Sequence, residues 1–373
     1  MLERVFLACL SAIMVDPAAS ADDRLHTSGD IRFRMEQDWA SARADGSERP
    51  DRLRARLRAR LQLNYRFSDT LDIAIRARSG DPESQQSPHV TVADFDGGQS
   101  DGLEAGLDRW RMRWRSETGA AFLGRDSLPL WRRNELFWDD DVTVTGLGGH
   151  ISGTQASGRR WRLAGGRFQA PVGLNRASGS LTAGQLMLEQ PAGTHPWTAA
   201  AGVIAIEADR DDPDAGRLLS GNGGRDYLLL IASMETQIEI GGQRVTIGAD
   251  LVENVEDYSA ADPDPRTAAN SGQTSGWVIS ARRGDASARG DWRFDYYFAR
   301  IETLAVNASY AQDDWVRWGA NGQTRSSGFQ GHELRAAYGL GGGANITARL
   351  YIVDGLRSAE DGNRARIDLN WRF

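Results

Sequence analysis

Residues 51–67 read DRLRARLRARLQLNYRF, and this stretch decides the fold. Arginine or a polar amide occupies every second position, and leucine, alanine or an aromatic residue lies between. On an α-helix, side chains two residues apart are separated by about 200°, so the arginines would scatter around the axis and leave no apolar stripe. On a β-strand, alternate side chains point to opposite faces. The stretch is therefore predicted to be a strand with one arginine face and one apolar face.

An arginine run most often marks a solvated face or a nucleic-acid arm. Two features argue against that explanation here. The apolar face is unbroken from Leu53 to Phe67, and the chain of 373 residues is acidic, with 44 basic and 51 acidic side chains, a net charge of −7 and a pI near 5.4. An acidic protein is a poor partner for a polyanion, so no nucleic acid is expected. A soluble β-sandwich would also bury the leucine face, so this stretch alone does not distinguish between fold classes and the rest of the chain is needed.

The N-terminus indicates export. Residues 1–21, MLERVFLACLSAIMVDPAASA, combine Arg4, an apolar stretch over 5–15 and the small-residue site Ala19-Ser20-Ala21. This pattern predicts a Sec signal peptide cleaved after Ala21, and residues 22–373 are expected to form one mature domain. The only cysteine, Cys9, lies inside the signal, so the mature chain has no disulfide and no cysteine metal site. Read as a lipoprotein cysteine, Cys9 would leave too few apolar residues ahead of it.

No later stretch has the 18 or more continuous apolar residues of a membrane helix, and the mean hydropathy is −0.49. An exported chain can still cross a membrane as a β-barrel, because only alternate residues then meet lipid. Alternating segments recur along the chain, at 29–36, 71–78, 109–115, 235–251, 291–298 and 332–352.

The connections between these segments alternate in length. Short ones fall near 68–70, 116–119, 153–159, 190–195, 241–243, 284–290 and 341–343. Long polar ones fall near 40–51, 80–103, 126–141, 169–181, 209–225, 255–273, 302–328 and 354–363. Outer-membrane barrels have an even strand number, short periplasmic turns and long outer loops. We therefore expect an all-β, antiparallel, up-and-down transmembrane barrel of about 16 strands, within a range of 14 to 18.

The C-terminal stretch RARIDLNWRF, residues 364–373, puts Ile367, Leu369, Trp371 and Phe373 on one face. An alternating strand that ends in phenylalanine resembles the signal by which the barrel-assembly machinery recognises its substrates, so that machinery is an expected partner. A soluble edge strand would end this way only by chance. Tryptophan and tyrosine gather at membrane interfaces. An outward belt near the periplasmic turns is predicted from Tyr65, Trp114, Trp161, Trp197, Trp292 and Trp371.

An ordered series of motifs resembles the bacterial putative porin family, whose members form 16-stranded outer-membrane barrels. The series is GDIRFRME, RLRARLQLNYRF, IRARSGDPESQQS, LDRWRMRW and LGRDSLPLW…LFWDDDVTVTGL, within residues 28–150. The resemblance implies a water-filled channel for passive diffusion of small hydrophilic solutes, in contact with outer-membrane lipid and lipopolysaccharide. A homotrimer is compatible with it. Trp110 and Arg111 stand where such proteins more often carry a small residue and tyrosine, so a substrate preference is not carried over.

The arginine faces are expected to line the pore, because the lumen of so wide a barrel is aqueous and inward charges keep their water. The predicted pore-lining residues are Arg32, Arg34, Arg54, Arg56, Arg58, Arg60, Arg76, Arg78, Arg111, Arg113 and Arg115. Such a wall predicts a weak preference for anions. The chain has no lysine at all. A GC-rich genome explains that bias, so only the placement of the arginines is used.

The long connection 126–141 is unusually apolar for a loop in water, and the third loop of porins folds into the barrel. Its acids Glu135, Asp139, Asp140 and Asp141 are candidates for a constriction that faces the arginine wall and sets up a transverse field. The alternative is that the aspartates cap the next strand at the outer rim, beside Arg132 and Arg133.

No enzyme, cofactor or metal is expected. The five histidines are dispersed, with no nucleophile motif and no zinc-ligand spacing, and GLGGG at 339–343 is a turn with no helix after it. Acidic loops such as 209–216 are equally compatible with Ca²⁺ binding and with simple exposure to solvent. Three functions remain. A diffusion porin is favoured, and the alternatives are a specific channel for an anionic oligo- or polysaccharide, like the alginate-export barrels, and a structural barrel with a plugged lumen.

Overall fold

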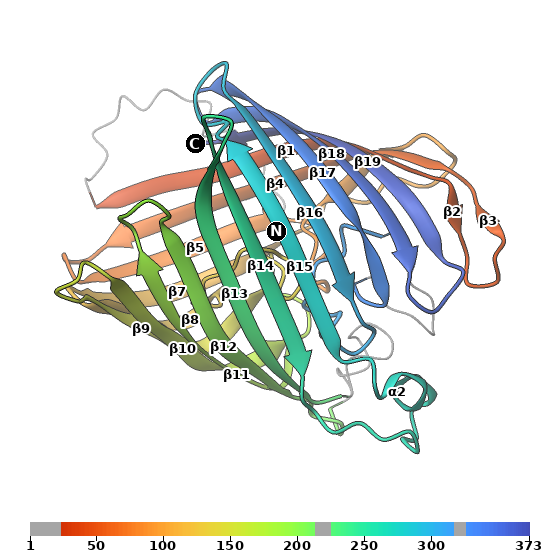
Figure 1. Ribbon diagram of the computed structural model, residues 1–373, viewed down its shortest axis with the longest axis horizontal. Coiled ribbons are helices and arrows are strands. Elements are labelled where there is room, and N and C mark those ends of the chain that lie inside the picture. Colours follow the sequence, from red (N-terminus) through yellow and green to blue (C-terminus); the bar gives the residue numbers. More distant parts are fainter. Residues whose placement is uncertain (1–23, 213–224, 317–325) are drawn as a thin grey trace.

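The computed structural model describes residues 24–212, 225–316 and 326–373, and within them one sheet closes on itself (Figure 1). Every neighbouring pair is antiparallel, and β1 (Leu25–Trp39) pairs with both β4 and the last strand, β19. The remaining barrel strands are β4 (Arg52–Arg66), β5 (Leu71–Ser79), β6 (Val90–Asp94), β7 (Ala105–Ser116), β8 (Gly119–Ser127), β9 (Thr143–Thr154), β10 (Arg160–Pro171), β11 (Ala177–Gln190), β12 (Trp197–Glu207), β13 (Tyr227–Ile240), β14 (Gln243–Asn254), β15 (Ser275–Gly284), β16 (Trp292–Ile301), β17 (Phe329–Gly341), β18 (Ala344–Gly355) and β19 (Asp361–Arg372).

The barrel has 16 strands, which confirms the predicted fold class. The sheet contains 17 strand segments, but β5 and β6 pair with successive parts of β4 and so form one interrupted strand. Outside the barrel wall lie a small hairpin of β2 (Ser41–Ala42) and β3 (Glu48–Arg49) and one short helix, α2 (Pro265–Asn270). No helix in the described ranges is long and apolar enough to cross a membrane.

The connections predicted as short are two to seven residues long and gather at one end of the barrel, and those predicted as long gather at the other. We call these the short-turn end and the long-loop end. Two loops predicted as long are only five residues each, at 172–176 and 356–360. The flanking strands β10, β11, β18 and β19 continue into residues that alternate weakly in sequence, because ladder hydrogen bonds to their neighbours extend the pairing.

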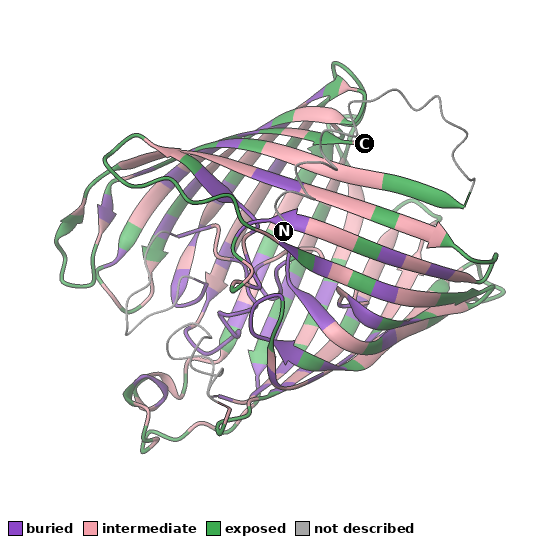
Figure 2. Ribbon diagram, turned by 180° about the vertical axis from the view of Figure 1, so that it is seen from behind, coloured by how far each residue is buried: buried purple, intermediate pink, exposed green. Residues whose placement is uncertain are grey.

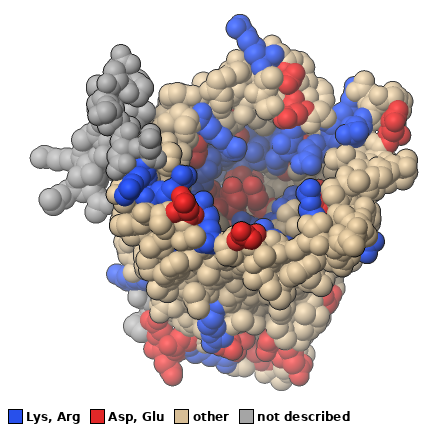
Figure 3. All heavy atoms as spheres, turned by 90° about the vertical axis from the view of Figure 1, so that its left-hand side faces the viewer, with Lys and Arg blue, Asp and Glu red and all other residues tan. Residues whose placement is uncertain are grey.

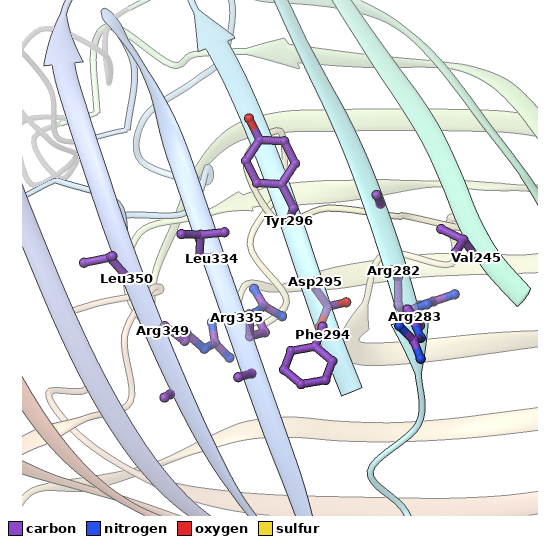
Figure 4. Close-up of a pocket in the computed structure, with 13 residues that line it drawn as sticks. Val245, Arg282, Arg283, Phe294, Asp295, Tyr296, Leu334, Arg335, Arg349 and Leu350 are labelled. Carbon is purple, nitrogen blue, oxygen red and sulfur yellow. The ribbon is translucent and has the colours of Figure 1, made fainter. Parts of the chain in front are cut away.

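The strands have an apolar outer face and a polar inner face, so that exposed and buried residues alternate along them (Figure 2). Phe33 is 55% exposed on the outer face, whereas Arg34 beside it is 1% exposed. Figure 4 shows the same change of side on β16 and β17, where Phe294 and Leu334 are exposed while Asp295 is buried inside. An apolar outer band of this kind is what a barrel needs to stand in lipid.

The six aromatic residues predicted to form a belt lie on this outer face, each in the part of a strand next to the short-turn end. Trp114, Trp292 and Trp371 are largely exposed there. Ile367 and Leu369 of β19 face outward beside them, and Phe373 exchanges two backbone hydrogen bonds with Gly29 of β1, at 2.9 and 3.1 Å. The predicted signal peptide, residues 1–21, lies outside the described residues.

Candidate functional site

The eleven arginines predicted to line the pore lie on the inner face of β1, β4, β5 and β7. Arg34, Arg58, Arg78 and Arg111 are buried there, and the side chains of Arg113 and Arg115, near the short-turn end, are 34% and 40% exposed. The closed barrel brings all of them to one side of the lumen, because β1, β4, β5 and β7 are neighbours in the sheet.

Carboxylates on these strands and on the neighbouring β19 compensate most of this positive charge. Asp30 accepts hydrogen bonds from Arg58 and Arg60, both at 2.7 Å, and Asp72 forms ion pairs with Arg111, Arg113 and Arg115. Glu36 pairs with Arg54 and Arg366, Asp108 with Arg76, and Asp368 with Arg34. Of the predicted arginines, Arg32 and Arg78 form no ion pair with a carboxylate of the described chain. The wall is therefore a ladder of both signs with a positive excess.

The predicted pore-lining set contained arginines alone, although alternation places acids of β1 and β5 on the same face. The alternation that turns Arg32 and Arg34 inward also turns Asp30, Glu36 and Asp38 inward, since all five positions have the same parity. The inward position of Asp108 could not be predicted from alternation. Asp108 faces the lumen because the β5–β7 ladder shifts register between Arg76 and Ala77, and such a bulge is not visible in the alternation.

The loop between β8 and β9, residues 128–142, crosses the inside of the barrel. At one end, Asp141 accepts a hydrogen bond from Arg60 of β4 at 2.7 Å. Toward the far wall, Arg133 donates to Asp250 of β14 at 2.9 Å and to Ser280 of β15 at 2.7 Å. Arg132 donates to the carbonyl oxygens of Trp138 and Asp139 within the loop. Arg133 thus ties the loop to the inner wall and Arg132 braces the loop's own backbone, and neither caps a strand at the rim.

A second loop, residues 302–316, also lies in the lumen, whereas the sequence analysis placed it among the outer connections. Asp314 forms ion pairs with Arg366 at 2.7 Å and with Arg34 at 3.6 Å on the inner wall. Tyr310 stacks on Trp138 with ring centroids 5.1 Å apart, and its carbonyl oxygen accepts from the Asp139 amide at 2.8 Å. The segment was missed because its run of small apolar residues shows neither strand nor helix periodicity.

A third segment, residues 80–89, fills the gap between β5 and β6. Gln85 donates to the carbonyl oxygen of Ser309 at 2.8 Å, and Gln86 donates to that of Ala311 at 2.6 Å. The three segments therefore support one another and narrow the lumen at its middle.

Opposite charges meet across a small space between these segments and the arginine wall, which we call the throat. It is a polar cavity of about 30 Å³, room for about two water molecules. Arg32, Arg58, His89 and Arg349 line it together with Glu135, Asp139, Asp140, Asp141 and Asp314. The four constriction candidates are thus gathered at one place, facing two of the predicted arginines. Figure 3 shows a hollow in the molecule with basic side chains around it and acidic atoms at its floor.

Burial and charge set the ionisation of the loop acids. Burial and the neighbouring Asp140 raise the pKa of Glu135 to about 7, and burial with Asp141 raises the pKa of Asp139 well above its ordinary value. Burial also acts to raise the pKa of Asp141, but Arg58 and Arg60 hold that pKa below its ordinary value. The loop therefore carries fewer negative charges at neutral pH than its four carboxyls suggest.

The carboxylates of Asp139, Asp140 and Asp141 lie within 4.8 Å of one another and form the one cluster of metal-type ligands within the described ranges. Arg58 and Arg60 pair with Asp141 at 3.7 and 2.7 Å, so the cluster is already in contact with cations of the protein. The geometry thus supports an electrostatic constriction.

Residues 46–167 match the model of the putative porin family. The resemblance predicted from the motifs is thereby confirmed, and the matched segment contains the β4 arginine strand, β7 and the whole loop 128–142. No curated protein matches the chain in sequence.

Solved porin structures share the fold over nearly the full chain. The high-pH structure of Pseudomonas putida OprB superposes with a TM-score of 0.55 at 11% identity and covers 94% of each chain. OmpF of Salmonella typhi in complex with daunomycin gives 0.52 at 11% identity, covering 94% of this chain and 97% of that one. The anion-selective porin from Comamonas acidovorans gives 0.51 at 10% identity, covering 94% and 99%. At such identities the likeness establishes the barrel fold alone.

Proposed function

We propose that this protein is an outer-membrane porin through which small hydrophilic solutes diffuse passively, with a weak preference for anions. The observation that carries the proposal is the throat: three inward segments narrow a closed, outwardly apolar barrel to a small polar passage between arginines and carboxylates. Such a passage acts on charge and size and needs no chemical step. In this proposal the chain is exported by its signal peptide, and the short turns face the periplasm.

The anion preference follows from the uncompensated arginines of the lumen. Arg32 at the throat and the buried Arg78 have no carboxylate partner in the described chain. Burial and neighbouring carboxylates raise the pKa of three of the four loop acids, which reduces their negative charge. The Comamonas acidovorans porin, described as anion-selective, supports the idea that this fold accommodates such a preference. A trimer is also part of the proposal, since OmpT of Vibrio cholerae, with a TM-score of 0.51 at 10% identity, was solved in a trimer form.

The test is a planar-bilayer recording with a salt gradient. At 0.01 M salt the Debye length is about 30 Å and the lumen field reaches the whole passage, whereas at 1 M it is about 3 Å. The reversal potential should therefore indicate selectivity for anions at low salt. Near 1 M it should approach the value of a channel without charge selectivity. A cation-selective channel at low salt would refute the anion preference, and a folded barrel without conductance would favour the structural alternative. Saturable block by an anionic polysaccharide would favour the specific channel instead.

A further inference from the structure

The lumen widens again on the short-turn side of the throat, into a cavity of about 460 Å³ that we call the vestibule. Its wall combines residues 130–136 of the inward loop with Arg162 near the start of β10, Arg282 near the end of β15 and Tyr297 of β16. Glu135, Asp140 and Gln312 line both the vestibule and the throat, so the two spaces adjoin.

We propose that the vestibule is a binding site for small monocarboxylates that carry a flat apolar face. The inference rests on the proposed channel function, because the site lies on the solute pathway. It goes further in naming one class of solute that the channel holds.

The positive charge of the vestibule comes from three arginines without a carboxylate partner in the described ranges. Arg162 donates only to the carbonyl oxygen of Pro129, at 3.2 Å, and Arg132 donates only to loop carbonyl oxygens. Arg282 is exposed to the lumen. Other arginines of the wall are neutralised, since Arg293 pairs with Asp295 and Arg335 with Glu333, both at 2.7 Å. Guanidinium groups bind carboxylates by charge-assisted hydrogen bonds, so these three sites favour an anion.

Two aromatic side chains and one leucine supply the apolar part of the vestibule. Leu130, Trp131 and Tyr297 line it. Gln185 of β11 clamps the backbone of Trp131 on both sides, accepting from its amide at 2.7 Å and donating to its carbonyl oxygen at 2.9 Å. The guanidinium of Arg335 lies 5.2 Å from the Tyr297 ring centroid and fixes that ring from one side. An indole on a fixed backbone and a phenol covered on one face offer stacking surface at a reduced entropic cost to the ligand.

The size and the acids of the cavity limit the ligand further. A volume of about 460 Å³ lies at the small end of ordinary ligand sites, which range over roughly 300–1,000 Å³. Glu135 and Asp140 lie at the throat side and repel a second carboxylate on the same molecule. A single carboxylate on a ring-sized body satisfies both constraints.

Calorimetric titration of the folded barrel in detergent tests the site without requiring current. Benzoate, glucuronate, acetate and benzyl alcohol are the probes. Benzoate should bind saturably. Acetate, which lacks the ring, should bind at least tenfold more weakly, and benzyl alcohol, which lacks the carboxylate, should not reach saturation. Glucuronate binding like benzoate assigns the flat face to a sugar ring, and benzoate binding alone assigns it to an aromatic ring. Equal binding of acetate and benzoate would overturn the apolar half of the proposal.

Two matched variants locate the site. R282Q and R162Q should each weaken benzoate about tenfold, the ordinary effect of losing one charge-assisted contact. R283Q is the control, because Arg283 adjoins Arg282 but points to the outer face, where it donates to Gln243. W131L should weaken benzoate while leaving acetate unchanged, and heat-dependent gel migration verifies that each variant is folded. Equal affinity of R282Q, R162Q and R283Q would place the ligand elsewhere and overturn the proposal.

Bilayer recordings on the same preparations separate this inference from the proposed function. A conducting, anion-preferring channel that binds none of the carboxylates overturns the inference alone. Carboxylate binding in a barrel without conductance overturns the diffusion function and leaves the binding site standing.

Discussion

At the scale of single residues, alternation decides which face a side chain occupies but not what it meets there. Arg34 and Asp368 were both assignable to the inner face from parity, yet their ion pair at 2.7 Å depends on the register of β1 against β19. The neutralisation of the arginine wall was therefore partly foreseeable. The uncompensated positions, Arg32 and Arg78, were not. Arg32 donates to Asn370 of the remote strand β19, and Arg78 donates to the Gln86 carbonyl oxygen in the irregular segment 80–89, which alternation does not describe.

Gly29 is a position where one added carbon has a clear consequence. A Cβ there would lie 2.6 Å from the Arg60 carbonyl oxygen and 2.6 Å from the Phe373 ring. G29A should therefore displace Phe373 or loosen β1 from β4, at a cost of about 1–3 kcal/mol. The urea midpoint of the heat-modifiable barrel should fall. G102A is the control, since nothing lies within 4 Å of its added carbon. Equal midpoints for the two variants would contradict the close contact.

At the scale of elements, strands were predictable and inward loops were not. A strand repeats its pattern every two residues, so β4 and β19 are visible from local sequence. The loop 302–316 has no repeat, and its place in the lumen is fixed by contacts with Trp138, Arg34 and Arg366 that are remote in sequence. The loop 128–142 was accessible to prediction only because its apolar side chains are out of place in water.

The seam between β1 and β19 closes the barrel through ion pairs in register. Arg34 faces Asp368, Glu36 faces Arg366 and Asp38 faces Arg364. A slip of one residue would turn the charges of the slipped strand toward lipid and leave those of its partner unpaired inside, so the pairs specify the register as well as holding it.

Breaking one seam pair should be costly because its partner stays buried. D38N leaves Arg364 and Arg52 without their shared carboxylate, at 2.6 and 3.0 Å, and should lower the unfolding free energy by about 3–5 kcal/mol. R364Q should have a similar effect, and the double variant should be less unstable than the sum of the two. A double-mutant cycle on urea unfolding measures this coupling. Strict additivity would mean that Asp38 and Arg364 act independently. The exposed Asp51 provides the control, as D51N.

At the scale of the whole molecule, the barrel supplies a closed ring of strands and the three inward segments narrow its lumen. The ring follows from a two-residue period repeated along the chain. The passage depends on contacts among three segments that are far apart in the sequence. This division explains why the fold and the arginine face were predictable while the throat and the vestibule required the structure.

The throat should make selectivity depend on pH near neutrality. Glu135 has a pKa raised to about 7 by burial and by Asp140, so it is mostly protonated at pH 5 and mostly ionised at pH 8. Ionisation adds a negative charge beside the passage, and the preference for anions should therefore weaken as the pH rises from 5 to 8. Reversal potentials at low salt measure this shift. E135Q should keep the stronger anion preference and flatten the pH profile around pH 7, whereas D257N, which changes an exposed outer-loop carboxylate, should leave the profile unchanged. A wild-type reversal potential that is constant over this range, or that moves toward anions with rising pH, would show that Glu135 does not act on the permeating ions.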